Sequence, residues 1–83
     1  MDKIARTPKD IGIALRSVRK AKNLTQGQLA DRSGIWQRTI SNIETDASGT
    51  KLDTIFSLCA ALDLEIHIKP RSTSRPVDIE DAF

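Results

Sequence analysis

The segment 24–44, LTQGQLADRSGIWQRTISNIE, constrains the fold of this chain more than any other stretch. It predicts two short helices separated at Gly34, because glycine readily adopts the left-handed conformation that ends many helices. Thr25 and Gln28 have the spacing of a capping box, in which each side chain bonds a backbone N–H at the start of the first helix. Two short helices joined by a tight turn indicate a helix-turn-helix, whose second helix can enter the major groove of DNA.

The second helix of this pair is predicted to be polar on the side that faces away from the core. Ile40 and Ile43 point inward, since residues three apart share one side of a helix. The side chains left outside are suited to reading base edges and binding phosphates, and they are Trp36, Gln37, Arg38, Ser41 and Asn42. The pattern therefore predicts a DNA-recognition helix.

This stretch resembles the helix-turn-helix of the Cro/C1 repressor-like (XRE) family. Within that family, TISNIE, a short loop and the run TKLDTIFSLCAALDLEIHI are similar to HipB-type antitoxins, and the likeness covers about residues 8 to 69. The resemblance implies a dimeric repressor that binds a palindromic operator in double-stranded DNA. It also implies a type II antitoxin that binds and neutralises a HipA-like Ser/Thr kinase toxin.

Length and composition allow one small domain. The 83 residues are 39% hydrophobic but only 4% aromatic, so the core should be aliphatic and small, and dimerisation would help its stability. The single cysteine, Cys59, excludes an intramolecular disulfide and is expected to be a buried apolar side chain. No apolar run approaches the ~20 residues of a membrane helix, and the N-terminus lacks a signal-peptide apolar region. We therefore expect a cytoplasmic, nucleoid-associated protein without membrane contact.

Charge is unevenly distributed along the chain, although the net charge is only +2. Residues 1–41 contain nine Lys/Arg and three Asp, whereas residues 76–83 contain three acidic side chains and no basic one. A charged helix face is usually only solvated, but here the basic half coincides with the helix-turn-helix. This combination is the electrostatic footprint expected for contact with phosphates.

Two further helices are predicted, one on either side of the helix-turn-helix. The first begins at Pro8 with Thr7 as its N-cap and Asp10 in its first turn, and it ends at Asn23 in a left-handed conformation. Its apolar stripe is Ile11, Ala14, Leu15, Val18 and Ala21. The last helix begins after a short loop with Thr50 as its cap, and its predicted inward face is Leu52, Ile55, Phe56, Cys59 and Leu62. The expected fold class is all-α, an XRE-type bundle of four to five helices.

Residues 64–69 change from helical to alternating periodicity. Leu64, Ile66 and Ile68 alternate with polar side chains, which predicts a strand. A lone strand needs a partner, most economically the same strand of a second copy, antiparallel across a two-fold axis. We therefore expect a DNA-binding domain over residues 1–69 that dimerises through this strand, as the HipB resemblance also implies.

Individual DNA contacts are implied by the resemblance to XRE repressors. Trp36, Gln37 and Arg38 match positions that face base edges. Gln37 suits adenine N6 and N7, and Arg38 suits guanine O6 and N7 or a phosphate. Thr39 and Ser41 are suited to contact backbone oxygens of the DNA. Gln26, in the first turn of its helix, matches the family's phosphate-binding glutamine, aided by the helix dipole.

Trp36 departs from the family pattern, because that position is usually a small polar cap and indole has no acceptor. Its ring packs either on a thymine methyl or the sugar backbone, or against the preceding helix. Arg19 and Glu44 match an Arg–Glu pair of several XRE proteins, which implies a tie between the first helix and the recognition helix, with Arg19 presented to a phosphate. Arg16 and Lys20 share the neighbouring face of the first helix, in a direction that the sequence leaves open.

No motif supports catalysis, a metal site or a bound cofactor. His67, the sole histidine, lies on the polar face of the predicted strand and should be solvated or at an interface. Residues 70–83 are predicted to form a disordered tail, because their composition does not supply a core. Val77, Ile79 and Phe83 alternate with acidic residues there, so the tail either only solubilises the protein or folds onto a basic groove of the kinase.

These observations lead to one expected function and two alternatives. The expected function is that of a non-enzymatic repressor of its own operon, acting as the antitoxin of a HipA-like kinase. The alternatives are a stand-alone XRE-family regulator without a toxin and a protein-interaction adaptor that reuses the fold without DNA. The basic N-terminal half argues against the adaptor.

Overall fold

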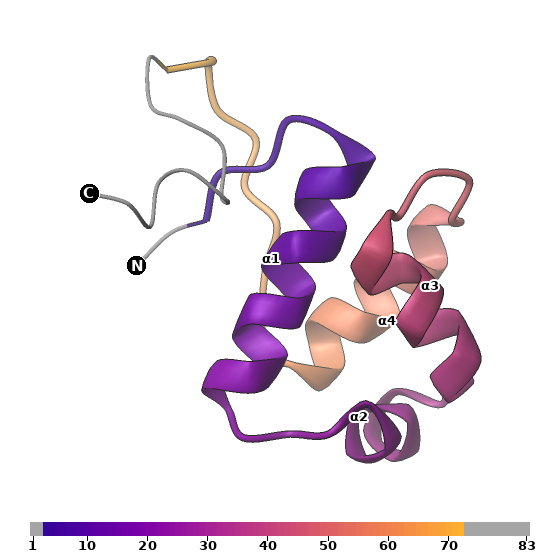
Figure 1. Cartoon of the computed structure of the whole chain (residues 1–83). Coiled ribbons are helices and arrows are strands. Elements are labelled where there is room, and N and C mark those ends of the chain that lie inside the picture. Colours follow the sequence, from indigo (N-terminus) through magenta and orange to yellow (C-terminus); the bar gives the residue numbers. More distant parts are fainter. Residues whose placement is uncertain (1–2, 73–83) are drawn as a thin grey trace.

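The computed structural model describes residues 3–72, and this part of the chain folds into a bundle of helices. Their bounds are α1 (Pro8–Ala21), α2 (Gln26–Ser33), α3 (Gln37–Thr45) and α4 (Leu52–Ala61). In Figure 1, α1 is seen at the left and α3 at the right, with α4 behind them and α2 at the lower end, and α1 packs against α3. None of the helices in the described range is long and apolar enough to cross a membrane. The prediction of an all-α fold is confirmed, with four helices.

The first helix begins and ends as its sequence predicts. Thr7 Oγ1 accepts a hydrogen bond from the backbone N–H of Asp10 at 3.1 Å, and Pro8 occupies the first helical position. The Asp10 carboxylate in turn accepts the backbone N–H of Arg6 at 2.9 Å. Asn23, just beyond the helix, has a φ of 58°, in the left-handed region. These local bonds fix where α1 starts and where the chain turns towards α2.

The ends of α2 are also set by local chemistry. Thr25 Oγ1 accepts the backbone N–H of Gln28 at 3.0 Å, and the Gln28 side chain accepts the backbone N–H of Thr25 at 2.8 Å. At the other end Gly34 has a φ of 74°, and its N–H donates to the carbonyl of Ala30 at 2.9 Å. The predicted capping box and the left-handed glycine are both confirmed.

An aliphatic core joins all four helices. Its most deeply buried large side chains come from α2, α3, α4 and the residue after α4, and they are Leu29, Ile40, Leu58 and Leu62. Cys59 is buried in the same cluster, as predicted, and burial raises the pKa of its thiol. The core therefore needs no aromatic side chain and holds α3 against the rest of the bundle.

The predictions for α4 were wrong in two respects. Its N-cap is Lys51 and not Thr50. Leu52 and Phe56 were predicted to face inward but are 65% and 49% exposed, whereas Leu58 is only 1% exposed. Apolar residues surround most of this helix, so periodicity alone does not identify the buried side. Packing of α4 against α2 decides it instead.

Residues 64–69 lie in an extended segment that belongs to no helix or strand of the described chain. Leu64 packs against the core, but Ile66 is 42% exposed and Ile68 is 97% exposed. Farther on, the Arg6 guanidinium donates to the Ser72 carbonyl at 2.7 Å, which holds the segment near the start of α1. The predicted ladder joins two copies of the chain, so it stays a prediction. Val77, Ile79 and Phe83 lie outside the described residues.

Candidate nucleic-acid interface

Helix α3 turns a polar face outward from the aliphatic core. Ile40 and Ile43 are 0% and 2% exposed, which confirms their predicted inward direction. Thr39 is half-buried at the edge of this face. The predicted contact residues on the outer face are all exposed, and they are Trp36, Gln37, Arg38, Ser41 and Asn42. The fold thus gathers these polar side chains and one large ring on the accessible side of one helix.

Trp36 is the N-cap of α3 and is 83% exposed. Its side chain makes no capping hydrogen bond, as expected for an indole, which has no acceptor. The possibility that the ring is buried against the preceding helix is therefore wrong. The ring is instead exposed to solvent at the start of α3, next to Gln37 and Arg38 in the sequence.

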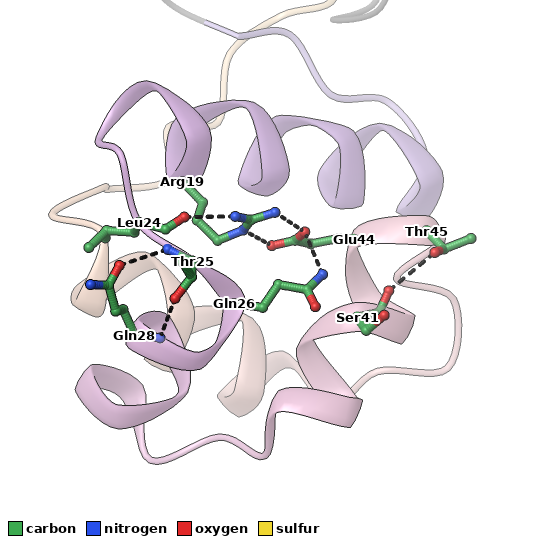
Figure 2. A network of polar contacts seen from close by, with 8 residues as sticks. All are labelled: Arg19, Leu24, Thr25, Gln26, Gln28, Ser41, Glu44 and Thr45. Carbon is green, nitrogen blue, oxygen red and sulfur yellow. Dashed lines mark hydrogen bonds and ion pairs between the residues drawn. The ribbon is translucent and has the colours of Figure 1, made fainter.

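A buried ion pair ties α1 to the end of α3, as predicted (Figure 2). Arg19 Nε donates to Glu44 Oε2 at 2.7 Å, and a terminal nitrogen of the same guanidinium donates to Glu44 Oε1 at 2.9 Å. The other terminal nitrogen donates to the carbonyl of Leu24 at 2.7 Å. The bonded Glu44 carboxylate raises the pKa of Arg19 above its ordinary value. Arg19 is only 7% exposed. Its contact with a phosphate stays a prediction.

The same carboxylate holds the first residue of α2. Gln26 Nε2 donates to Glu44 Oε1 at 3.2 Å, so one side chain of α3 bonds both α1 and α2 (Figure 2). This bond brings the amide of Gln26 beside the recognition helix. The predicted phosphate contact of Gln26 stays a prediction.

A shallow surface hollow lies where α1, α2 and α3 meet. Its walls are formed by Arg16, Gln26, Ser41, Glu44 and Thr45. The Thr45 hydroxyl donates to the Ser41 carbonyl at 3.1 Å, within α3. The sequence left the direction of Arg16 open, and the structure places it on the same side as Gln26 and Ser41. The only signal for this in the sequence was its position one turn before Arg19 on the same helix.

The described residues contain no group of three or more His, Cys, Asp or Glu side chains placed to hold a metal ion. His67 lies in the exposed segment after α4, where its Nε2 contacts the carboxylate of Glu65. Both side chains are largely accessible to solvent. The interface on α3 is therefore the site that the described fold presents most clearly.

Comparison with known proteins identifies the family. A helix-turn-helix family model matches residues 15–68. The chain is 32% identical over 74 residues to the antitoxin HipB of Escherichia coli K12, which covers 89% of this chain and 84% of HipB. It is also similar to the complex of a HipB variant with the O2 20mer, with a TM-score of 0.81, 30% identity and coverage of 87% of this chain and all of that one. A HipA-HipB-O2-O3 complex gives a TM-score of 0.77 at 33% identity, with the same coverage.

The relatives that this chain matches are HipB antitoxins, which are not enzymes, in agreement with the prediction of a non-enzymatic binding protein. The family model begins within α1 and ends in the extended segment after α4, so it includes the whole of α2 and α3. The chain therefore belongs to the XRE-type helix-turn-helix family of DNA-binding proteins and is a homologue of the HipB antitoxins.

Proposed function

We propose that this protein represses its own operon and serves as the antitoxin of a HipA-like kinase, acting in the bacterial cytoplasm at the nucleoid. The main observation in support of the DNA-binding role is the exposed polar face of α3. The aliphatic core and the Arg19–Glu44 ion pair hold this helix in a fixed orientation. A rigid support of this kind is what base reading requires, because the hydrogen bonds of direct readout depend on geometry. The similarity to HipB complexes supports the same role.

Within this role, Gln37 and Arg38 read base edges in the major groove. They occupy the first turn of α3, and the N-terminal residues of a recognition helix are those that reach the bases. Trp36 lies beside them and packs on a thymine methyl or a sugar. Thr39, Ser41, Asn42 and Gln26 contact the DNA backbone or neighbouring bases.

Replacing Gln37 with alanine is expected to weaken binding to the operator by about 1–3 kcal/mol, because the bidentate contact to adenine is lost. Binding to random-sequence DNA should change much less, since backbone contacts dominate there. Fluorescence anisotropy with both duplexes measures the two losses in one experiment. Equal weakening on the two DNAs would show that Gln37 is not a base reader.

The repressor acts as a homodimer in this proposal, closed by Leu64, Ile66 and Ile68. The exposed Ile66 and Ile68 support this assignment, because an extended segment with free apolar side chains can pair with a second copy. In an antiparallel pair, opposite residues lie on the same face, so the apolar side chains of one copy meet those of the other. Such a dimer would present two recognition helices to the two halves of a palindrome.

The toxin partner is the least direct part of the proposal. The HipA-HipB-O2-O3 complex supports it, because that relative contains HipA. We place the kinase contact on the acidic tail, with Val77, Ile79 and Phe83 as apolar anchors against a basic groove. Co-purification of a kinase with the full chain would distinguish the antitoxin from the stand-alone regulator, which has no such partner.

A further inference from the structure

We propose that Arg16 binds a DNA phosphate at the hollow between α1, α2 and α3, with Gln26 and Ser41 as the other donors. This inference rests on the proposed DNA-binding function and adds a residue to it. Arg16 is exposed and lines the hollow. Arg19, one turn farther along α1, is the cation that the family pattern favours, but it is buried and bonded to Glu44 and Leu24. Of these two arginines, Arg16 is therefore the one whose guanidinium is accessible.

Charge at the hollow depends on Arg16. The Glu44 carboxylate belongs to the wall and would repel a phosphate if it stood alone. Arg19 binds that carboxylate through two hydrogen bonds, so the two formal charges offset each other. Arg16 supplies the remaining positive charge among the residues that line the hollow. Removing it would leave the hollow without the net charge that attracts a phosphate.

Gln26 and Ser41, which also line the hollow, supply hydrogen-bond donors rather than charge. Gln26 has two N–H groups on its amide and donates one to Glu44, so the second can donate to a phosphate oxygen. The hydroxyl of Ser41 is a further donor on the exposed side of α3. A guanidinium binds phosphate oxygens through two parallel N–H groups, which suits Arg16 to the main contact. The hollow thus joins one cation with two neutral donors from three helices.

Replacing Arg16 with glutamine tests this assignment on the full chain with a short random-sequence duplex as the probe. Each phosphate contact contributes a slope of about 0.9 in the dependence of log affinity on log salt. Two contacts in a dimer correspond to about a 12-fold change in affinity between 50 and 200 mM salt. We therefore expect the affinity of the variant to fall about 12-fold less than that of the parent between 50 and 200 mM salt. Arg71→Gln is the matched control, because it removes the same charge from an exposed residue that follows the extended segment 64–69.

A flatter salt dependence in Arg16→Gln, with Arg71→Gln unchanged, supports the phosphate contact. Equal flattening in both variants would overturn it, because Arg16 would then act only through the overall charge. An unchanged slope in Arg16→Gln would also overturn it. A parent chain that binds no duplex at all would instead overturn the proposed DNA-binding function. Circular dichroism of each variant checks that the helices are retained.

Discussion

Replacing Arg19 with methionine is expected to lower the free energy of unfolding by about 3–5 kcal/mol, because the variant leaves a buried carboxylate without its cation. The side chains of Arg19 and Glu44 are only 8% and 3% exposed, so water does not take over the lost contacts. The variant also loses the bond from Arg19 to the Leu24 carbonyl. Unfolding in urea, followed by circular dichroism, measures the loss.

The double variant Arg19→Met with Glu44→Leu is the control for this prediction. Replacing both members of a buried ion pair with apolar side chains is often nearly neutral, because no charge is left buried. The double variant should therefore be clearly more stable than Arg19→Met alone. If the single and double variants are destabilised alike, by less than about 1 kcal/mol, the pair does not stabilise the fold in the way described.

Replacing Gly12 with alanine is expected to destabilise the protein by about 1–3 kcal/mol or more, although alanine in place of glycine ordinarily favours a helix by about 1 kcal/mol. A Cβ at Gly12 would lie 2.2 Å from the carbonyl oxygen of Ile43. Because that oxygen belongs to the backbone of α3, the two helices would have to move apart. Thermal unfolding of the variant measures the effect, and operator affinity should fall with it as α3 shifts.

Gly27→Ala is the matched control, since Gly27 also lies inside a helix. Its Cβ would meet the side chain of Gln37 at 3.5 Å and that of Thr25 at 3.8 Å, which are ordinary contacts. The control should leave stability unchanged or slightly raised. If Gly12→Ala stabilises the protein as much as Gly27→Ala does, then α1 and α3 do not pack as closely as the structure shows.

The sequence predicts best those features that neighbouring residues determine. Thr7, the Thr25–Gln28 box and Gly34 act within a few residues of the helix ends that they set, and all behave as predicted. Ile40 and Ile43 were also placed correctly, because polar residues around them leave one apolar side on α3. In these cases the neighbouring residues are enough to predict the helix ends and the buried side of the helix.

Features that depend on contacts between helices could not be predicted in the same way. Apolar residues surround α4, so only packing shows that Leu58 is buried while Phe56 is exposed. No residue near Gly12 in the sequence indicates that α3 approaches this glycine closely. The direction of Arg16 likewise depends on where α2 and α3 lie relative to α1. The hollow is formed by such contacts between helices, so the sequence predicted the exposed face of α3 but not the hollow beside it.

Selection of binding sites by the full chain from a random-sequence DNA pool tests whether this protein is a dimeric, sequence-specific repressor, and it requires no knowledge of the operator. A dimeric repressor is expected to enrich inverted repeats whose half-sites are about 34–36 Å apart, or one helical turn of DNA. The same repeat should occur upstream of the protein's own gene. A pool without enrichment, or one enriched in sites that lack two-fold symmetry, would contradict a dimeric, sequence-specific repressor.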